Sequence, residues 1–264
     1  MKIKQQQEFK PGITPIVDSK GPYKEFLMDF EILKMNQGQK YSNSEPLERA
    51  YLLINGKIKV SFLDKEETLE RENFYDHDPI LVQVCNNVEF EIECLNEDTE
   101  IAIFKTENDK LDYCRIYTKD DIRIEIRGKG TMNETATRIV RTIIDHSINP
   151  DSNLMIGEDM HYPGKWAGFP SHYHPQPEIY FYKFYPSNGF GLLKLEDEGV
   201  LLEQNDTVLI RPNLDHPQVA APGYGMYFIW TIRHLEGNPY LAPIFKDEHK
   251  WAEQPDAVIW PDKH

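Results

Sequence analysis

Hydrophobic and polar residues alternate in short runs along the first half of the chain. In Val88–Glu93 every second residue is apolar, which is the period of a β-strand with one buried face. Asn55-Gly56 lies between two such runs and predicts a two-residue hairpin turn. Strands are predicted in this half at residues 26–33, 48–54, 57–62, 81–84, 88–93 and 100–104.

The second half repeats this pattern. Strands are predicted at residues 138–145, 153–158, 178–184, 190–195, 207–211 and 224–233. Strands that recur at spacings of roughly 8–12 residues, with turn residues between them, are typical of sandwiches and barrels. Two such sets predict an all-β bicupin, with two jelly-roll β-barrel domains in one chain. Polar segments at Asn108–Asp112 and Thr118–Asp121 place the boundary near residue 120, with domains at 1–120 and 121–264.

Charge and cysteine content narrow the possible partners and the compartment. The chain has 44 acidic and 29 basic residues, a net charge of −15, which argues against binding to nucleic acid or to an anionic membrane. It contains no apolar run of 18 residues and no apolar segment at its start. Three cysteines without metal-type spacing suggest free thiols. We therefore expect a cytoplasmic protein.

One group of residues in the second half has metal-ligand character. His172 and His174 are two residues apart and so share one face of a strand. Glu178 follows a Pro-Gln-Pro turn, and His216 lies downstream in a proline-flanked segment. Three imidazoles and a carboxylate suit one divalent transition-metal ion, Zn, Mn, Fe or Ni, and an open coordination position would make the site catalytic. The alternative is a set of solvated loop histidines.

The first half offers no comparable set, because His77 stands alone between two acidic residues. We expect no metal in that domain. The C-terminal tail carries Trp251 and Trp260, which favour a contact with a second subunit and hence a homo-oligomer, although packing on the chain's own surface is the alternative.

Several longer motifs carry a family resemblance. They are Met160–His174, the aromatic strand opened by Glu178, Asp206–Pro217, and Ala220–Tyr227. Together they resemble the 5-deoxy-glucuronate isomerase family of inositol catabolism, a bicupin group related to the 5-keto-4-deoxyuronate isomerases. The resemblance is specific from about residue 138 to 234 and only architectural before it.

The resemblance implies a metal-dependent aldose–ketose isomerase that converts 5-deoxy-glucuronate to 5-dehydro-2-deoxy-gluconate. It places His172, His174, Glu178 and His216 at the metal-ligand positions. The chain departs from the family pattern at Tyr173 and Pro175, at Leu214-Asp215, and at Lys183 where the family favours arginine. These departures bear on the exact sugar more than on the type of reaction.

The candidate catalytic residues are Glu178 and Tyr227. We expect Glu178 to be a metal ligand first, and the alternative is that it carries the proton. Strand alternation puts Tyr182 on the inward face with Glu178 and directs Lys183 outward unless a bulge intervenes. It also allows at most one of Tyr224 and Tyr227 to face the interior.

The small-molecule sugar acid that we expect as substrate carries a carboxylate, which favours a cationic partner. The substrate-binding candidates are Lys183, Arg211, Arg233, Tyr182 and Asp215. Asp215 is expected either to contact a sugar hydroxyl or to turn outward into solvent. Two other functions remain open, namely an Fe-dependent cupin dioxygenase, which would consume oxygen, and a non-catalytic sugar-binding cupin.

Overall fold

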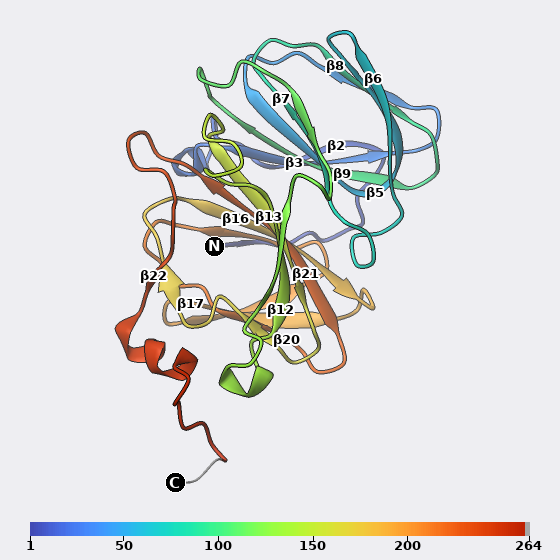
Figure 1. The fold of residues 1–264 in the computed structure, drawn as a ribbon. Coiled ribbons are helices and arrows are strands. Elements are labelled where there is room, and N and C mark those ends of the chain that lie inside the picture. Colours follow the sequence, from blue (N-terminus) through green and yellow to red (C-terminus); the bar gives the residue numbers. More distant parts are fainter. Residues whose placement is uncertain (262–264) are drawn as a thin grey trace. The chain divides into compact units, whose positions relative to one another are not determined.

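The computed structural model describes residues 1–261, and nearly all of its regular elements are strands (Figure 1). The chain forms two compact units. The first unit contains Gln7–Ile122 and Ile143–Met155, and the second contains Met1–Gln6, Arg123–Thr142 and the described chain from Ile156 onward. The predicted boundary after residue 120 lies beside the crossing from Ile122 to Arg123. The short segments that each unit draws from elsewhere in the chain were not foreseen.

The first unit is built on a nine-stranded antiparallel sheet. Six strands follow one another in the order β10-β7-β5-β9-β3-β2, and β6, β8 and β4 extend it from β5. The elements are β2 (Gly12–Val17), η1 (Lys24–Phe26), β3 (Asp29–Met35), β4 (Lys40–Asn43), β5 (Glu48–Phe62), β6 (Lys65–Arg71), β7 (Ile80–Val84), β8 (Phe90–Cys94), β9 (Thr99–Thr106) and β10 (Arg115–Tyr117).

The hairpin predicted at Asn55-Gly56 is wrong. Strand β5 runs through these two residues without turning back. Before them it pairs with β7 and β9, and after them it pairs with β6 and β8, with a register irregularity at Leu53/Asn55. Gly56 has φ +126°, and a Cβ there would lie 2.2 Å from Oγ1 of Thr99. Glycine is therefore needed because the strand bends here and passes close to β9.

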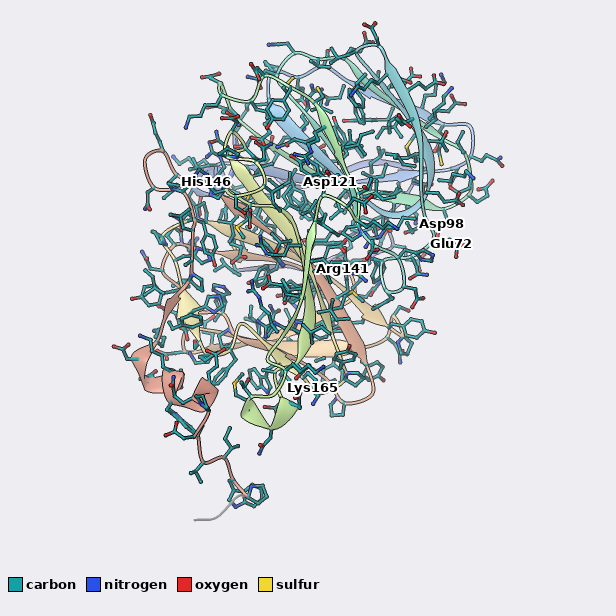
Figure 2. All side chains as sticks on the ribbon, in the orientation of Figure 1. Glu72, Asp98, Asp121, Arg141, His146 and Lys165 are labelled. Atoms are coloured by element: carbon teal, nitrogen blue, oxygen red, sulfur yellow. The ribbon has the colours of Figure 1, made fainter. Side chains whose placement is uncertain are left out.

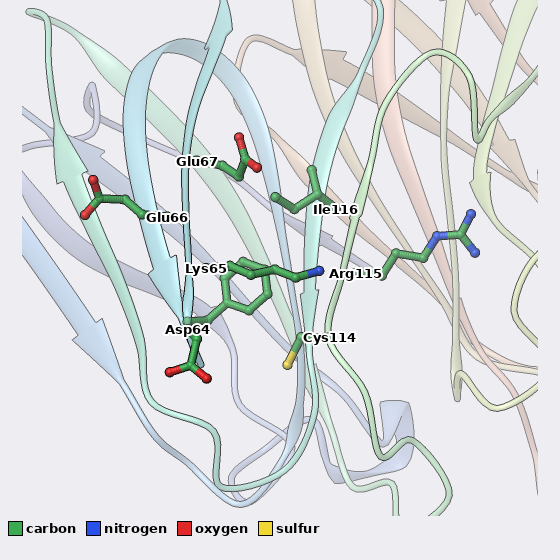
Figure 3. Close-up of a pocket in the computed structure, with 8 residues that line it drawn as sticks. Asp64, Lys65, Glu66, Glu67, Cys114, Arg115 and Ile116 are labelled. Carbon is green, nitrogen blue, oxygen red and sulfur yellow. The ribbon is translucent and has the colours of Figure 1, made fainter.

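A hollow of about 530 Å³ lies on the first unit between the β5–β6 hairpin and β10 (Figure 3). Its charged side chains include Lys65, Glu66 and Arg115. The Arg115 guanidinium pairs with Asp121 at 2.7 Å and lies over the Tyr117 ring. Because that cation is already engaged, the hollow is a poor candidate for an anionic ligand.

The second unit contains a seven-stranded sheet in the order β1-β19-β16-β21-β13-β12-β11, a four-stranded sheet in the order β14-β20-β17-β18, and the pair β15-β22. The N-terminal strand thus joins the edge of a sheet formed by the second half of the sequence. The elements are β1 (Lys2–Ile3), β11 (Arg123–Arg127), η2 (Met132–Glu134), β12 (Arg138–Ile144), β13 (Leu154–His161), β14 (Trp166–Ala167), β15 (His172–Tyr173), β16 (Glu178–Tyr185), β17 (Phe190–Leu195), β18 (Glu198–Glu203), β19 (Thr207–Ile210), β20 (Gln218–Ala220), β21 (Gly225–Arg233), β22 (Ile244–Phe245) and η3 (Asp247–Glu253).

The register of β16 against β21 fixes which side chains share a face. Glu178 lies opposite Ile232, and Tyr182 lies opposite Phe228. Since side chains alternate along a strand, Glu178 and Tyr182 point to one side of the sheet. We call this side the inner face of the second unit, because Tyr182 meets Gln218 of the four-stranded sheet there.

The all-β character predicted from the alternating pattern is confirmed. The described residues contain no helix that is long and apolar enough to cross a membrane. The cysteines, at residues 85, 94 and 114, are free thiols, as predicted.

Candidate metal centre

Three of the predicted ligands converge in the second unit. His174 follows β15, Glu178 opens β16, and His216 precedes β20. The Nε2 atoms of His174 and His216 lie 3.2 Å and 3.3 Å from the same Glu178 oxygen. All three side chains are buried, and their ligand atoms lie within 4.8 Å of one another, as a metal-binding group requires.

Hydrogen bonds on the far side of both rings set their tautomers. Nδ1 of His174 lies 2.9 Å from the carbonyl oxygen of Gln176, and Nδ1 of His216 lies 2.8 Å from that of Leu214. Because a carbonyl oxygen only accepts, each Nδ1 carries the hydrogen, and in a neutral imidazole Nε2 is left with a lone pair. Backbone contacts of this kind commonly orient metal-binding histidines.

The centre therefore directs two nitrogen lone pairs at one carboxylate oxygen. Burial lowers the pKa of His216, against the opposing charge of Glu178, and so favours its neutral form. Nε2 of His216 has no hydrogen-bond partner among the described residues. A cation between these atoms would turn their mutual repulsion into attraction, and imidazole with carboxylate suits a divalent transition metal. The residues present fit such an ion.

His172 lies at the edge of this group. Its ring centroid is 5.0 Å from that of His216 and 5.7 Å from that of Phe245, and its Nδ1 is 3.3 Å from the carbonyl oxygen of Pro170. Burial, reinforced by the neighbouring His216, holds the pKa of His172 well below its usual value. The structure thus brings three of the four predicted ligands together and leaves His172 beside them.

Aromatic side chains line the inner face next to the centre. The Tyr180 ring is 5.7 Å from His216 and 4.8 Å from Phe228. The Tyr182 hydroxyl donates to Oε1 of Gln218 at 2.6 Å. Burial and then the charge of Glu178 raise the pKa values of Tyr180 and Tyr182 well above 10. Both phenols therefore stay protonated at neutral pH and act as wall and donor rather than as base.

Two predicted site residues lie on the other face of the sheet. Lys183 pairs in register with Tyr227, so both point away from the side that carries Glu178. The Tyr227 hydroxyl donates to Glu158 at 2.6 Å, and Glu158 lies 3.5 Å from Arg141, which Figure 2 labels. Lys183 donates to Asn205 at 3.0 Å. The structure does not bring Tyr227 or Lys183 to the metal centre.

The predicted arginines are also remote from the inner face. Arg211 follows β19 and is exposed. Arg233 is the last residue of β21, and because Ile232 pairs with Glu178 on the inner face, Arg233 points to the other face of the sheet. Asp215 adjoins His216, but its carboxylate accepts hydrogen bonds from Ser171 at 2.5 Å and Lys194 at 2.9 Å. Asp215 is buried, so the expected position out in solvent is wrong. Both hydrogen bonds use Oδ2, and Oδ1 has no hydrogen-bond partner among the described residues, so a contact with a sugar hydroxyl stays a prediction. Among the substrate-binding candidates only Tyr182 lies on the inner face.

Sequence reasoning missed the contribution of the C-terminal segment. Strand β22 pairs with β15, and Tyr240 places its ring 4.9 Å from that of His174. Gln176 donates to the carbonyl oxygen of Asn238 at 2.9 Å. No motif marks Tyr240 or β22 in the sequence, because two-residue strands leave no alternating pattern.

Sequence reasoning also missed the polar residues of β13. Asp159 and His161 share one face of this strand with Gly157, whose missing Cβ makes room for the Trp230 ring. The alternation of these residues was the only signal available.

Comparison with known proteins places the chain in a family. The model of the KduI/IolB family matches residues 2–252. A 5-deoxy-glucuronate isomerase of Geobacillus kaustophilus is 27% identical over 244 residues, which cover 84% of each chain. One from Geobacillus thermodenitrificans is 25% identical over 245 residues, covering 84% of this chain and 85% of the relative.

Solved structures show the same fold. An IolB-like protein of Salmonella typhimurium superposes with a TM-score of 0.83 at 20% identity, covering 95% of this chain and 98% of that one. A cupin 2 conserved barrel domain protein of Leptotrichia buccalis gives 0.52 at 12% identity, covering 88% and 96%. The predicted cupin fold is confirmed.

Proposed function

This chain belongs to the KduI/IolB family and is an isomerase, and from that premise we propose that it interconverts a deoxy-uronate and the corresponding keto acid. The pair we propose is 5-deoxy-glucuronate and 5-dehydro-2-deoxy-gluconate, because the curated relatives carry the name of that isomerase. The reaction moves a proton from C2 to C1 of the open-chain sugar acid.

We expect the protein to act in the cytoplasm as a homo-oligomer. Trp251 and Trp260 are exposed and available for a subunit contact.

The observation that supports this proposal best is the buried group of His174, Glu178 and His216. We propose that these residues, with His172 as a fourth ligand, hold one divalent transition-metal ion. Such an ion would supply a Lewis acid that stabilises negative charge on the sugar's oxygen atoms as the proton leaves carbon. Its identity among Zn, Mn, Fe and Ni is left to measurement.

The protein's own residues divide the remaining work. Glu178 is the only carboxylate of the centre, so it is also the nearest group able to carry a proton between adjacent carbons. Tyr180 and Tyr182 are protonated and wall the inner face, where they exclude water from the reacting carbons. Tyr227 is not part of this proposal, because its hydroxyl is on the opposite face.

Metal removal and restoration test the proposal. Purified protein is analysed for metals, stripped with a chelator, and reloaded with Zn, Mn, Fe or Ni in separate samples. Isomerisation of 5-deoxy-glucuronate, followed by NMR, should disappear on stripping and return with at least one metal. Oxygen consumption in step with substrate loss would instead support a dioxygenase. Sugar acid binding without turnover would support a non-catalytic cupin.

A further inference from the structure

Two buried polar side chains on the inner face of the second unit lack partners for some of their atoms. The His161 side chain is fully buried, and neither ring nitrogen has a hydrogen-bond partner among the described residues. The amide nitrogen of Gln218 is likewise buried and unpartnered within that part of the chain. An unsatisfied buried polar group destabilises the fold. Such groups persist mainly where water or a ligand satisfies them.

His161 borders Phe228 directly, whereas Gln218 is linked to Phe228 only through Tyr182. The ring centroids of His161 and Phe228 are 5.2 Å apart, and those of Tyr182 and Phe228 are 5.5 Å apart. Oε1 of Gln218 accepts a hydrogen bond from the Tyr182 hydroxyl, which fixes the orientation of the amide. The NH2 group of Gln218 can therefore donate to another partner. A chain of contacts through Phe228 and Tyr182 thus connects His161 to Gln218, and we call these four residues the layer of Phe228.

This layer adjoins the metal centre through a row of rings. The Tyr180 ring lies 4.8 Å from Phe228 on one side and 5.7 Å from His216 on the other. On the strands, Tyr180 also stands between Glu178 and Tyr182 in the register. A carbon chain held at Glu178 would therefore pass over Tyr180 on its way to the layer of Phe228.

Asp159 sets the hydrogen-bonding character of His161. It accepts hydrogen bonds from Arg138 at 3.2 Å and Trp230 at 3.0 Å, and Nε2 of His161 lies 3.7 Å from it. Burial alone would raise the pKa of Asp159, but His161 and Arg138 outweigh it and lower this pKa. An ionised carboxylate favours the tautomer with the hydrogen on Nε2, which leaves Nδ1 as an acceptor.

The layer therefore offers one acceptor, Nδ1 of His161, and one donor, the NH2 group of Gln218. A hydroxyl group both donates and accepts, so it matches this pair. A carboxylate would not match, because it cannot donate to Nδ1 and would meet the negative charge of Asp159. A hydroxyl-bearing carbon chain is thus the ligand class that satisfies both orphaned groups.

We propose that His161 and Gln218 bind a hydroxyl group of the substrate outside its two reacting carbons, and so determine specificity. This inference rests on the proposed function, since the sugar acid is assumed to be held at its reacting end by the metal centre. In 5-deoxy-glucuronate the hydroxyls in question are those on C3 and C4. The remaining alternative is that ordered water alone satisfies both side chains.

The test compares His161→Phe, which keeps ring shape without polar atoms, with His161→Asn, whose amide retains a polar group near the position of Nδ1. Gln218→Met is the second site variant, and His77→Phe on the first unit is the matched control. For 5-deoxy-glucuronate we expect His161→Phe and Gln218→Met to raise KM by about 10- to 100-fold, with kcat changed less than about threefold. His161→Asn should recover part of the loss, and metal content should stay at the wild-type level.

Substrates that lack one hydroxyl identify the contact. With either 3,5-dideoxy- or 4,5-dideoxy-glucuronate, whichever lacks the bound hydroxyl, wild type and His161→Phe should have the same KM. A loss of equal size on all three substrates, or no loss on any, would overturn the inference and leave the layer to water.

Binding of a non-reacting ligand separates this inference from the proposed function. Calorimetry with the C1-reduced form of 5-deoxy-glucuronate measures affinity without turnover. Weaker binding by His161→Phe supports the contact even if wild type fails to isomerise any uronate, whereas that failure alone contradicts only the proposed function. Equal affinity of wild type and variant, or no binding by either, would overturn the contact.

Discussion

Ser171 donates a hydrogen bond to Asp215 at 2.5 Å, and each of these residues immediately precedes a histidine of the metal centre region, His172 and His216. The bond therefore ties together two segments that are far apart in the sequence. Lys194 of β17 and Lys246, next to β22, lie 2.9 Å and 3.7 Å from the same carboxylate. Asp215 thus holds together the loops that carry the histidines.

This arrangement predicts a pH-dependent contribution to stability. Burial alone would raise the pKa of Asp215, but Ser171 and Lys194 lower it below the ordinary value. A carboxyl with a lowered folded-state pKa stabilises the fold above its unfolded pKa, about 3.9, and this stabilisation is lost as the pH falls further. Asp215→Asn should therefore unfold at a lower midpoint urea concentration than wild type from pH 7 to about pH 4. Below pH 4 the difference between the two midpoints should narrow. Asp197→Asn, on an exposed carboxylate, is the control; a difference that widens on acidification would refute the assignment.

The metal centre predicts about one ion per chain, bound by the second unit. His174→Ala and His216→Ala should each lose the ion, while the melting temperature changes little because a large β core does not depend on one site. Elemental analysis by mass spectrometry and circular dichroism measure the two properties, with His77→Ala as the control. Stoichiometric metal in the double variant His172→Ala/His174→Ala would show that the site is elsewhere.

The first unit contains a buried carboxylate, Glu48, that accepts hydrogen bonds from four neutral groups. Glu48 accepts hydrogen bonds from the side chains of Gln83 and Ser152, both at 2.6 Å, from Asn108 at 2.7 Å and from the backbone of Asn153 at 2.9 Å. All four partners donate to it. Gln83 cannot turn its amide round, since its oxygen accepts from Tyr117 and Asn149.

Replacing Glu48 by glutamine would place an NH2 group against two of these donors. We expect Glu48→Gln to destabilise the protein by about 1–3 kcal/mol, the cost of buried groups left without partners. Chemical denaturation measures the free energy of unfolding of this variant. Glu70→Gln is the control, because Glu70 is exposed and paired with Lys57. We expect it to change stability by less than about 0.5 kcal/mol. Equal stability of Glu48→Gln and wild type would mean that the network rearranges at no cost.

Gly157 lies directly against the Trp230 ring. A Cβ there would lie 2.1 Å from the Trp230 ring, whereas one on Gly199 of β18 would meet nothing within 4 Å. Gly157→Ala should therefore displace Trp230 from Asp159 and cost about 1–3 kcal/mol, while Gly199→Ala should be tolerated. Tryptophan fluorescence and thermal melts compare the two variants. Equal melting temperatures and equal fluorescence of the two variants would mean that Trp230 moves aside without loss of stability.

Alternating residues predicted strands with one buried face, such as Phe190–Leu195. Glu178–Tyr185 is buried on both faces, and its run of aromatic residues predicted it instead. Asn55-Gly56 misled because the same dipeptide that favours a hairpin also suits a bend within a long strand, and only β9 packed behind Gly56 distinguishes them.

Residue type and spacing identified the candidate metal ligands that the structure brings together, His174, Glu178 and His216, but did not identify the other residues of the inner face. The face on which Tyr227 lies was not predictable, because its register with Lys183 is set by the pairing of two strands that are far apart in the sequence. His161 and Gln218 are 57 residues apart in the sequence, and they are connected only through Phe228 and Tyr182, which the pairing of β16 with β21 brings together. Such long-range contacts leave no local pattern.

Incubation of the metal-loaded protein with 5-deoxy-glucuronate in D2O, followed by NMR, tests the central claim most directly. The proton that leaves C2 passes to a protein group that exchanges with solvent, so we predict a keto acid product that carries deuterium at the carbon that was C1. Product with the original hydrogen fully retained would indicate a shielded base or a hydride shift instead. Absence of any keto acid product while the site is filled with metal would contradict the account.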